Sequence, residues 1–159
     1  MRKPIVAGNW KCNKTSKEAV ELLGQLKTQI ADVSSADVVL CPPFTALAAL
    51  SANMGKSPMA LGAQDVFWEA QGAFTGEISA GMLLDLGCKF CIIGHSERRQ
   101  YFKETDEQVR KKLVALLANK ITPIICVGET LSEREQGSTF KVIETQLGGA
   151  LEGISSALA

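Results

Sequence analysis

The sequence predicts an α/β fold in which a parallel sheet is built from repeated strand–helix units. Short apolar runs alternate along the chain with longer segments whose apolar residues recur at helical spacing. The short runs are almost continuously apolar, which is typical of parallel strands that are covered on both faces. Such units are joined by right-handed crossovers, so two architectures fit the pattern: an open doubly wound sheet, or an arc of a (β/α)8 barrel.

The individual elements follow from the same periodicity. Five strands are expected, over residues 4–9, 36–41, 59–63, 89–94 and 121–127. Two longer helices begin at a capping box, in which side chains satisfy the free N–H groups of the first turn: Thr15 with Glu18, and Thr105 with Gln108. Shorter helices are expected near residues 45–51, 78–86 and 96–102, and a last helix over 140–154.

Length and composition indicate one domain over residues 1–159. The chain is 46% apolar and 21% charged, as in an ordinary globular protein. Basic and acidic residues number 17 each, so there is no basic surplus for a nucleic acid or an anionic membrane surface. No apolar run approaches the roughly 18 residues that span a bilayer, and the first run stops at Gly8, too early for a signal peptide. We therefore expect a cytoplasmic protein whose five cysteines are reduced and serve for packing.

The nucleotide-binding version of an open sheet lacks its phosphate loop here. No Gly-x-Gly-x-x-Gly follows any expected strand. Gly55-Lys56-Ser57 resembles the end of a P-loop, but Leu50 stands where the first glycine is needed. The sequence thus disfavours a GTPase or a dinucleotide enzyme.

Polar side chains collect where the expected strands end, which is where barrel enzymes place their sites. Asn9 and Lys11 end the first strand, and His95 and Glu97 follow the fourth. Alternation along a strand puts His95 on the same side as Ile93. If that side faces the barrel interior, Lys11 and His95 converge on one mouth. Further charged residues are interpreted first as a structural or interface ion network: Glu77, Arg98, Arg99 and Glu104.

His95 is the only histidine, and its context favours catalysis over a structural role. It follows a strand and Gly94, and Ser96 is a suitable N-cap for a short helix. The partial positive charge of helix N–H groups disfavours imidazolium, and a neutral ring can donate a hydrogen bond to a substrate oxygen. Lys11 is interpreted as a fixed cation for an anionic substrate group. Glu97 has two open interpretations, as a carboxylate at a helix start or as the partner of Lys11.

Four longer motifs occur in order along the whole chain. They are Asn9-Trp10-Lys11-Cys12-Asn13, Gly72-Ala73-Phe74-Thr75-Gly76-Glu77, Ile93-Gly94-His95-Ser96-Glu97-Arg98-Arg99 and Cys126-Val127-Gly128-Glu129. Together they closely resemble the triosephosphate isomerase family. The resemblance implies a (β/α)8 barrel of roughly 250 residues, of which this chain holds the first five units. It also implies interconversion of dihydroxyacetone phosphate and glyceraldehyde 3-phosphate through an enediolate, in glycolysis and gluconeogenesis, without a cofactor or a metal.

The same resemblance assigns roles to particular residues. His95 is implied to be the electrophile that polarises substrate oxygens and works with a carboxylate base, a pairing already known for that family. Lys11 is implied to hold the substrate's anion, with Asn9 helping to position it and Glu97 orienting Lys11. Glu129 would touch the lid that closes over the substrate.

The resemblance further implies a homodimer. A long loop would insert into the partner subunit near its Asn9–Lys11 segment. The residues implied at this contact are Cys12, Gln64, Phe74, Thr75, Gly76, Glu77 and Arg98.

The family's catalytic base is a Glu in an Ala-Tyr-Glu-Pro motif after strand six, and the sequence contains no such motif. We therefore expect the N-terminal part of an isomerase, inactive alone, which the complementary C-terminal barrel segment would complete. Two other functions stay open: a standalone scaffold or interaction module that reuses the fold, and another phosphate-handling enzyme such as a lysine Schiff-base aldolase.

Overall fold

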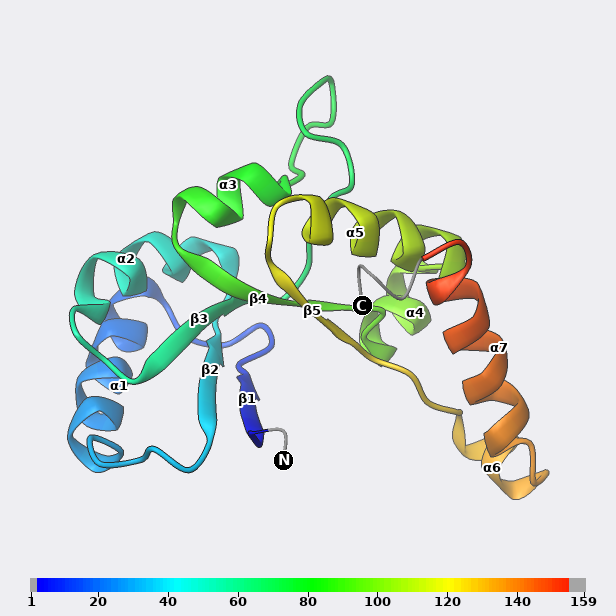
Figure 1. The fold of residues 1–159 in the computed structure, drawn as a ribbon, viewed down its shortest axis with the longest axis horizontal. Coiled ribbons are helices and arrows are strands. Elements are labelled where there is room, and N and C mark those ends of the chain that lie inside the picture. Colours follow the sequence, from blue (N-terminus) through cyan, green and yellow to red (C-terminus); the bar gives the residue numbers. More distant parts are fainter. Residues whose placement is uncertain (1–2, 155–159) are drawn as a thin grey trace.

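Five parallel strands form one curled sheet in the computed structural model, which describes residues 3–154 (Figure 1). Their order in the sheet is their order in the chain. The strands are β1 (Ile5–Asn9), β2 (Asp37–Cys41), β3 (Met59–Ala63), β4 (Cys88–Ile93) and β5 (Thr122–Ile125). A doubly wound sheet would reverse its strand order at a switch point, so the uninterrupted order confirms an arc of a (β/α) barrel.

Helices flank the curled sheet and connect the strands (Figure 1). The expected capping boxes are present at Thr15 and Thr105, and each begins a helix where the sequence predicted one. The helices are α1 (Ser16–Gln29), α2 (Phe44–Met54), α3 (Ala80–Asp85), α4 (Ser96–Phe102), α5 (Asp106–Ala118), α6 (Leu131–Glu135) and α7 (Thr139–Leu151). None of the helices in residues 3–154 is long and apolar enough to cross a membrane.

The structure departs from the expected boundaries mainly after β4. Helix α6 was not predicted, because Leu131 is its only apolar residue and no periodicity marks it; a third capping box, Thr130 with Glu133, begins it. Strand β5 is shorter than expected and ends at Ile125. Helix α7 ends at Leu151, earlier than expected.

The apolar core has two parts because the sheet has two faces. The larger part lies between the sheet and its helices and includes Leu23, Leu47 and Leu116. The smaller part lies on the other face, where Val39, Cys41 and Ile92 are buried, and partly buried side chains join them: Ala60, Phe90, Ile124 and Cys126. Five strands therefore already form part of a barrel interior.

Strands β1 and β5 are the two edges of the described sheet, since each pairs with one neighbour only within residues 3–154. Apolar side chains on β1 remain open to solvent, with Ile5 51% and Val6 58% exposed. Pro123 lies in β5, where its missing N–H is tolerated because an edge strand has one unpaired side. These edges are surfaces that a closed barrel would cover.

Gly62 in β3 is the point of closest approach inside the curled sheet. A Cβ at this position would lie 2.6 Å from the Sγ atom of Cys41 and 2.9 Å from Cγ1 of Val39. We expect Gly62→Ala to lower the free energy of unfolding by about 1–3 kcal/mol through overpacking. Gly24→Ala in α1, where nothing lies within 4 Å of an added Cβ, should raise it by about 0.5–1 kcal/mol. Urea unfolding measures both, and an unchanged midpoint for Gly62→Ala would contradict the close approach.

Candidate functional site

Loops that follow β1, β3 and β4 gather polar side chains at the carboxyl edge of the sheet. They line a hollow of about 170 Å³. Its polar lining includes Asn9, Lys11, Gln64, His95 and Glu97, and Cys12, Asp65, Phe44, Arg98 and Phe102 complete it. The structure therefore brings the predicted lysine and histidine to one opening.

Lys11 is held in a left-handed backbone conformation, with a φ of 53°. Its N–H donates to Oδ1 of Asn9 at 3.0 Å, and its carbonyl accepts from Nε2 of Gln64 at 2.9 Å. The same Gln64 amide donates to the carbonyl of Cys41 at 2.8 Å. A strained conformation persists where its surroundings over-determine it. Here the side chains of Asn9, at the end of β1, and Gln64, directly after β3, do so.

Glu97 forms an ion pair with Lys11. Its Oε1 lies 2.7 Å from Nζ of Lys11, and the two side chains are 41% and 54% exposed. Glu97 also lies in the first turn of α4. Glu97 is therefore both a carboxylate at a helix start and the partner of Lys11, the two interpretations that the sequence left open. The ammonium of Lys11 stays accessible from the hollow.

His95, rather than the expected Ser96, is the N-cap of α4. Its Nδ1 accepts the N–H of Glu97 at 3.2 Å, closer than the 3.5 Å to Oε2 of the same residue. A ring nitrogen that accepts a hydrogen bond carries no proton, so the neutral ring holds its proton on Nε2. The helix start thus orients the imidazole and selects its tautomer.

Strand alternation does not carry His95 to this opening, and that expectation was wrong. Ile93 and Cys91 belong to the core between sheet and helices, while Ile92 belongs to the barrel-interior cluster. The backbone changes direction at Gly94, whose φ is +70°. A Cβ there would lie 3.0 Å from the carbonyl oxygen of Cys126, so only glycine makes this turn without strain.

A buried ionic cluster lies beside the hollow, and sequence reasoning missed its central cation. Nζ of Lys112 lies 2.6 Å from Asp65 and 2.8 Å from Glu104. Nε of Arg98 lies 2.9 Å and 2.6 Å from the same two carboxylates. The signal was a lysine on the apolar face of α5, next to Leu113, a position where an unpaired charge is costly.

The pKa values of the two carboxylates are shifted in opposite directions. For Asp65, burial is the stronger effect and raises the pKa in spite of Lys112 and Arg98. For Glu104, burial alone would also raise the pKa, but hydrogen bonds and charge from Lys112, Arg98 and the Gly94 N–H outweigh it and lower the pKa. Burial therefore dominates at Asp65, whereas the cations and the Gly94 N–H dominate at Glu104.

The remaining predicted site residues lie outside the hollow. The long loop between β3 and α3 projects from the body (Figure 1), and its residues Phe74, Thr75, Gly76 and Glu77 are all exposed. Glu129 is mostly buried, accepts a hydrogen bond from Thr139 at 3.3 Å, and lines a second hollow that also contains His95. Arg99 pairs with Asp106 at 2.6 Å, so of the expected ion network Arg98, Arg99 and Glu104 have carboxylate or cation partners in the described chain.

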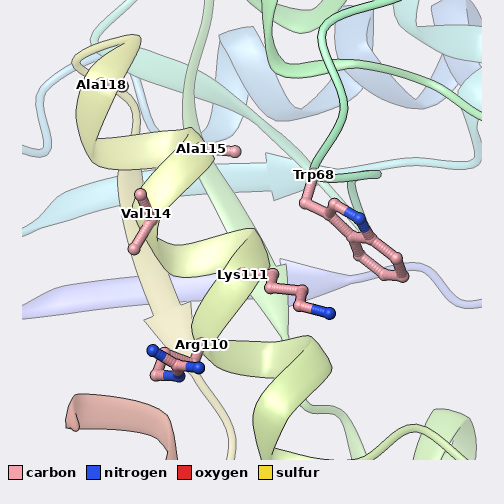
Figure 2. A pocket seen from close by; sticks show the side chains of 6 residues that line it. All are labelled: Trp68, Arg110, Lys111, Val114, Ala115 and Ala118. Atoms are coloured by element: carbon pink, nitrogen blue, oxygen red, sulfur yellow. The ribbon is translucent and has the colours of Figure 1, made fainter. Parts of the chain in front are cut away.

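A larger hollow, of about 280 Å³, lies away from this chemistry, along the outer side of α5 beside Trp68 (Figure 2). Alanine and valine side chains form much of its wall, and Lys111 lies over the Trp68 ring at 5.5 Å. It contains neither a carboxylate nor an imidazole, and the hollow that contains Glu129 lacks Lys11. We therefore place the candidate site at the hollow of about 170 Å³, which Lys11 and His95 line together. Within residues 3–154 no group of three or more His, Cys, Asp or Glu side chains could hold a metal ion.

Fold and site together define a (β/α)-barrel protein whose polar side chains lie at the carboxyl ends of its strands. The family model described as triosephosphate isomerase matches residues 4–159. The chain belongs to the triosephosphate isomerase family.

Relatives of this chain bear the same description. The triosephosphate isomerase of Citrifermentans bemidjiense is 54% identical over 155 residues, which cover 98% of this chain and 62% of the relative. That of Moorella thermoacetica is 52% identical and covers 100% of this chain and 64% of the relative. The crystal structure of triosephosphate isomerase from Bartonella henselae superposes with a TM-score of 0.91 at 36% identity, over 98% of this chain and 65% of that one. The chain thus spans less than two thirds of the length of these relatives.

The Lys11–Glu97 pair should be visible in the titration of Glu97. The hydrogen bond from Lys11, with its charge, lowers the pKa of Glu97. The pair is therefore intact above the ordinary pKa of a glutamate and is lost as the pH falls through the lowered value. We expect Lys11→Met to return the pKa of Glu97 toward the ordinary value, measured from its carboxyl carbon shift by NMR. Lys17→Met, an exposed position in α1, should leave that pKa unchanged, and the same pKa in both variants would contradict the pairing.

Proposed function

We propose that this chain supplies the cation and the electrophile of a triose phosphate isomerase site. The observation that carries the proposal is the meeting of Lys11, His95 and Glu97 around one hollow at the carboxyl edge of the sheet. Family membership supports the reaction, and the arrangement supports the division of roles. Asn9 accepts a hydrogen bond from the backbone N–H of Lys11, and Glu97 forms an ion pair with the ammonium of Lys11.

The reaction requires stabilisation of negative charge on oxygen. Moving a proton between neighbouring carbons of a ketose and an aldose phosphate passes through an enediolate, whose charge lies on two oxygens. The Nε2–H of a neutral His95 would donate to those oxygens, and positioned donors of this kind are effective because they need no reorganisation. The half-exposed ammonium of Lys11 would hold the anionic substrate against the opening.

The base, the lid and a partner subunit complete the proposal. The single tyrosine, Tyr101, lies between Gln100 and Phe102, so the expected Ala-Tyr-Glu-Pro motif is not in this sequence. We place the base in the part of the relatives that this chain does not cover, with Glu129 beside the lid. The projecting loop with Phe74, together with Cys12, Gln64 and Arg98, would form the contact of a homodimer in a cytoplasmic enzyme of glycolysis.

A Schiff-base aldolase is a poorer fit to the contacts of the lysines. The amine that attacks a carbonyl has to be neutral, which a desolvated apolar pocket favours. Lys11 is half-exposed and lies 2.7 Å from a carboxylate, an arrangement that keeps it charged. Lys112 is buried but lies within 2.8 Å of two carboxylates.

The proposal is tested by completing the barrel. Residues 1–159 are fused to the C-terminal part of the Citrifermentans bemidjiense relative that this chain does not cover. We expect isomerase activity from the fusion and none above background from the chain alone. In the fusion, His95→Gln should lower kcat by about 10²–10⁴-fold, the usual contribution of a positioned proton donor. Lys11→Met should remove most of kcat/KM.

Matched controls make each outcome decisive. Lys17→Met removes a lysine outside the hollow and should leave kcat and KM unchanged. Circular dichroism and sedimentation confirm that each variant folds. A folded but inactive fusion, an active chain alone, or full activity of His95→Gln would each overturn the proposal, and a borohydride-trapped adduct on Lys11 would favour the aldolase.

A further inference from the structure

Lys112 is a buried cation that the proposed chemistry does not use. It is 3% exposed and lies on the apolar face of α5 with Val109, Leu113 and Leu116. Burying an ammonium costs several kcal/mol unless carboxylates and hydrogen bonds satisfy it. Asp65 and Glu104 do so, and the contact to Asp65 joins residues 47 positions apart in the chain. A well-packed apolar side chain would stabilise α5 at least as well, so stability alone does not account for this lysine.

Lys112 joins two carboxylates that lie next to different site residues: Glu104 lies next to the turn before His95, and Asp65 next to Gln64, which contacts Lys11. Glu104 accepts the N–H of Gly94 at 2.9 Å, and Gly94 directly precedes His95. Asp65 directly follows Gln64, whose amide holds the carbonyl of Lys11. Lys112 therefore links the turn that aims the imidazole to the segment that fixes the lysine backbone.

The turn at Gly94 has little room to move, so a displacement of Glu104 also displaces this turn. Atoms of three neighbours surround the position of a Cβ on Gly94: the Cys126 oxygen at 3.0 Å, Nη2 of Arg99 at 3.1 Å and Cγ2 of Val109 at 3.2 Å. Nε of Arg99 also donates to the Gly94 carbonyl at 2.9 Å. With its N–H on Glu104 and its carbonyl on Arg99, this peptide segment follows any displacement of Glu104.

We propose that Lys112 is a positioning residue that sets the placement of Lys11 relative to His95 by holding Asp65 and Glu104 together. The inference deepens the proposed function and rests on it for its meaning in catalysis. The inference also makes a structural prediction that does not depend on activity: a change on the Asp65 side of the cluster must alter the position of His95. Arg98 touches both carboxylates too, but it is partly exposed, so the ammonium of Lys112 is the cation fully enclosed between them.

The test reads His95 directly by NMR in the 159-residue chain. Because His95 is the only histidine, its imidazole nitrogens give one unambiguous pair of signals. Lys112→Met keeps an unbranched side chain, shorter by the terminal ammonium alone, and removes its charge. We expect shifted His95 ring nitrogens and at least about tenfold faster hydrogen exchange of the Gly94 and Glu97 amides, because local opening is no longer opposed by the cluster. Lys111→Met, the exposed neighbour that pairs with Glu107, should change neither.

Two further variants separate positioning from stability. Leu116→Ala destabilises α5 by about 2–5 kcal/mol while every charged member of the cluster stays in place, and it should leave the His95 ring signals in place. Asp65→Asn keeps the size of the side chain, removes one charge on the Lys11 side, and should shift the His95 signals across the cluster. It also serves where Lys112→Met does not fold. Unmoved His95 ring signals in the folded variants, or equal shifts in Leu116→Ala, would overturn the inference.

The active fusion adds a kinetic readout. A misplacement on the order of 1 Å costs about 10²-fold in rate, so Lys112→Met should lower kcat by about 10–100-fold while the fusion remains folded. An inactive fusion without any substitution would count against the proposed function only. The NMR signals of His95 would still report whether Lys112 positions it.

Discussion

The direction of the strands decides where chemistry can occur in this chain. All five strands are parallel and lie in chain order, so each strand delivers the residues that follow it to the same edge of the sheet. Lys11 after β1, Gln64 after β3 and His95 after β4 meet there although they are far apart in the sequence. The helices return the chain to the opposite edge before each new strand. The hollow is therefore a consequence of the sheet's polarity before it is a property of any one residue.

Two ion clusters at this edge contain the same kinds of group and have opposite character. The Lys11–Glu97 pair is half-exposed and screened by water, so it contributes little to stability and leaves an ammonium open to a ligand. Lys112, Asp65 and Glu104 are enclosed, and removal of one of them leaves an uncompensated buried charge. The two lysines carry the same ammonium group and differ in burial. The exposed Lys11 can bind a ligand, whereas the buried Lys112 can only hold its neighbours in place.

Local patterns predicted most of the fold. Continuous apolar runs marked the five strands, and capping boxes at Thr15 and Thr105 marked two helices, because both signals depend on neighbouring residues only. The direction of His95 was not predictable from alternation, since Gly94 turns the backbone out of the strand pattern. The partners of Lys112 were not predictable either, because Asp65 reaches it only through the tertiary fold.

The conformation of Lys11 has a cost that a different residue would avoid. A φ of 53° suits glycine or asparagine, and an ordinary side chain there stores roughly 1–3 kcal/mol of strain. Lys14, Lys103 and Lys120 share this conformation, but of the four only Lys11 lines the hollow, where the proposed function needs an ammonium. Under the proposed function, position 11 is a place where the protein gives up folding free energy to keep a charge, and where stabilising substitutions would lower activity.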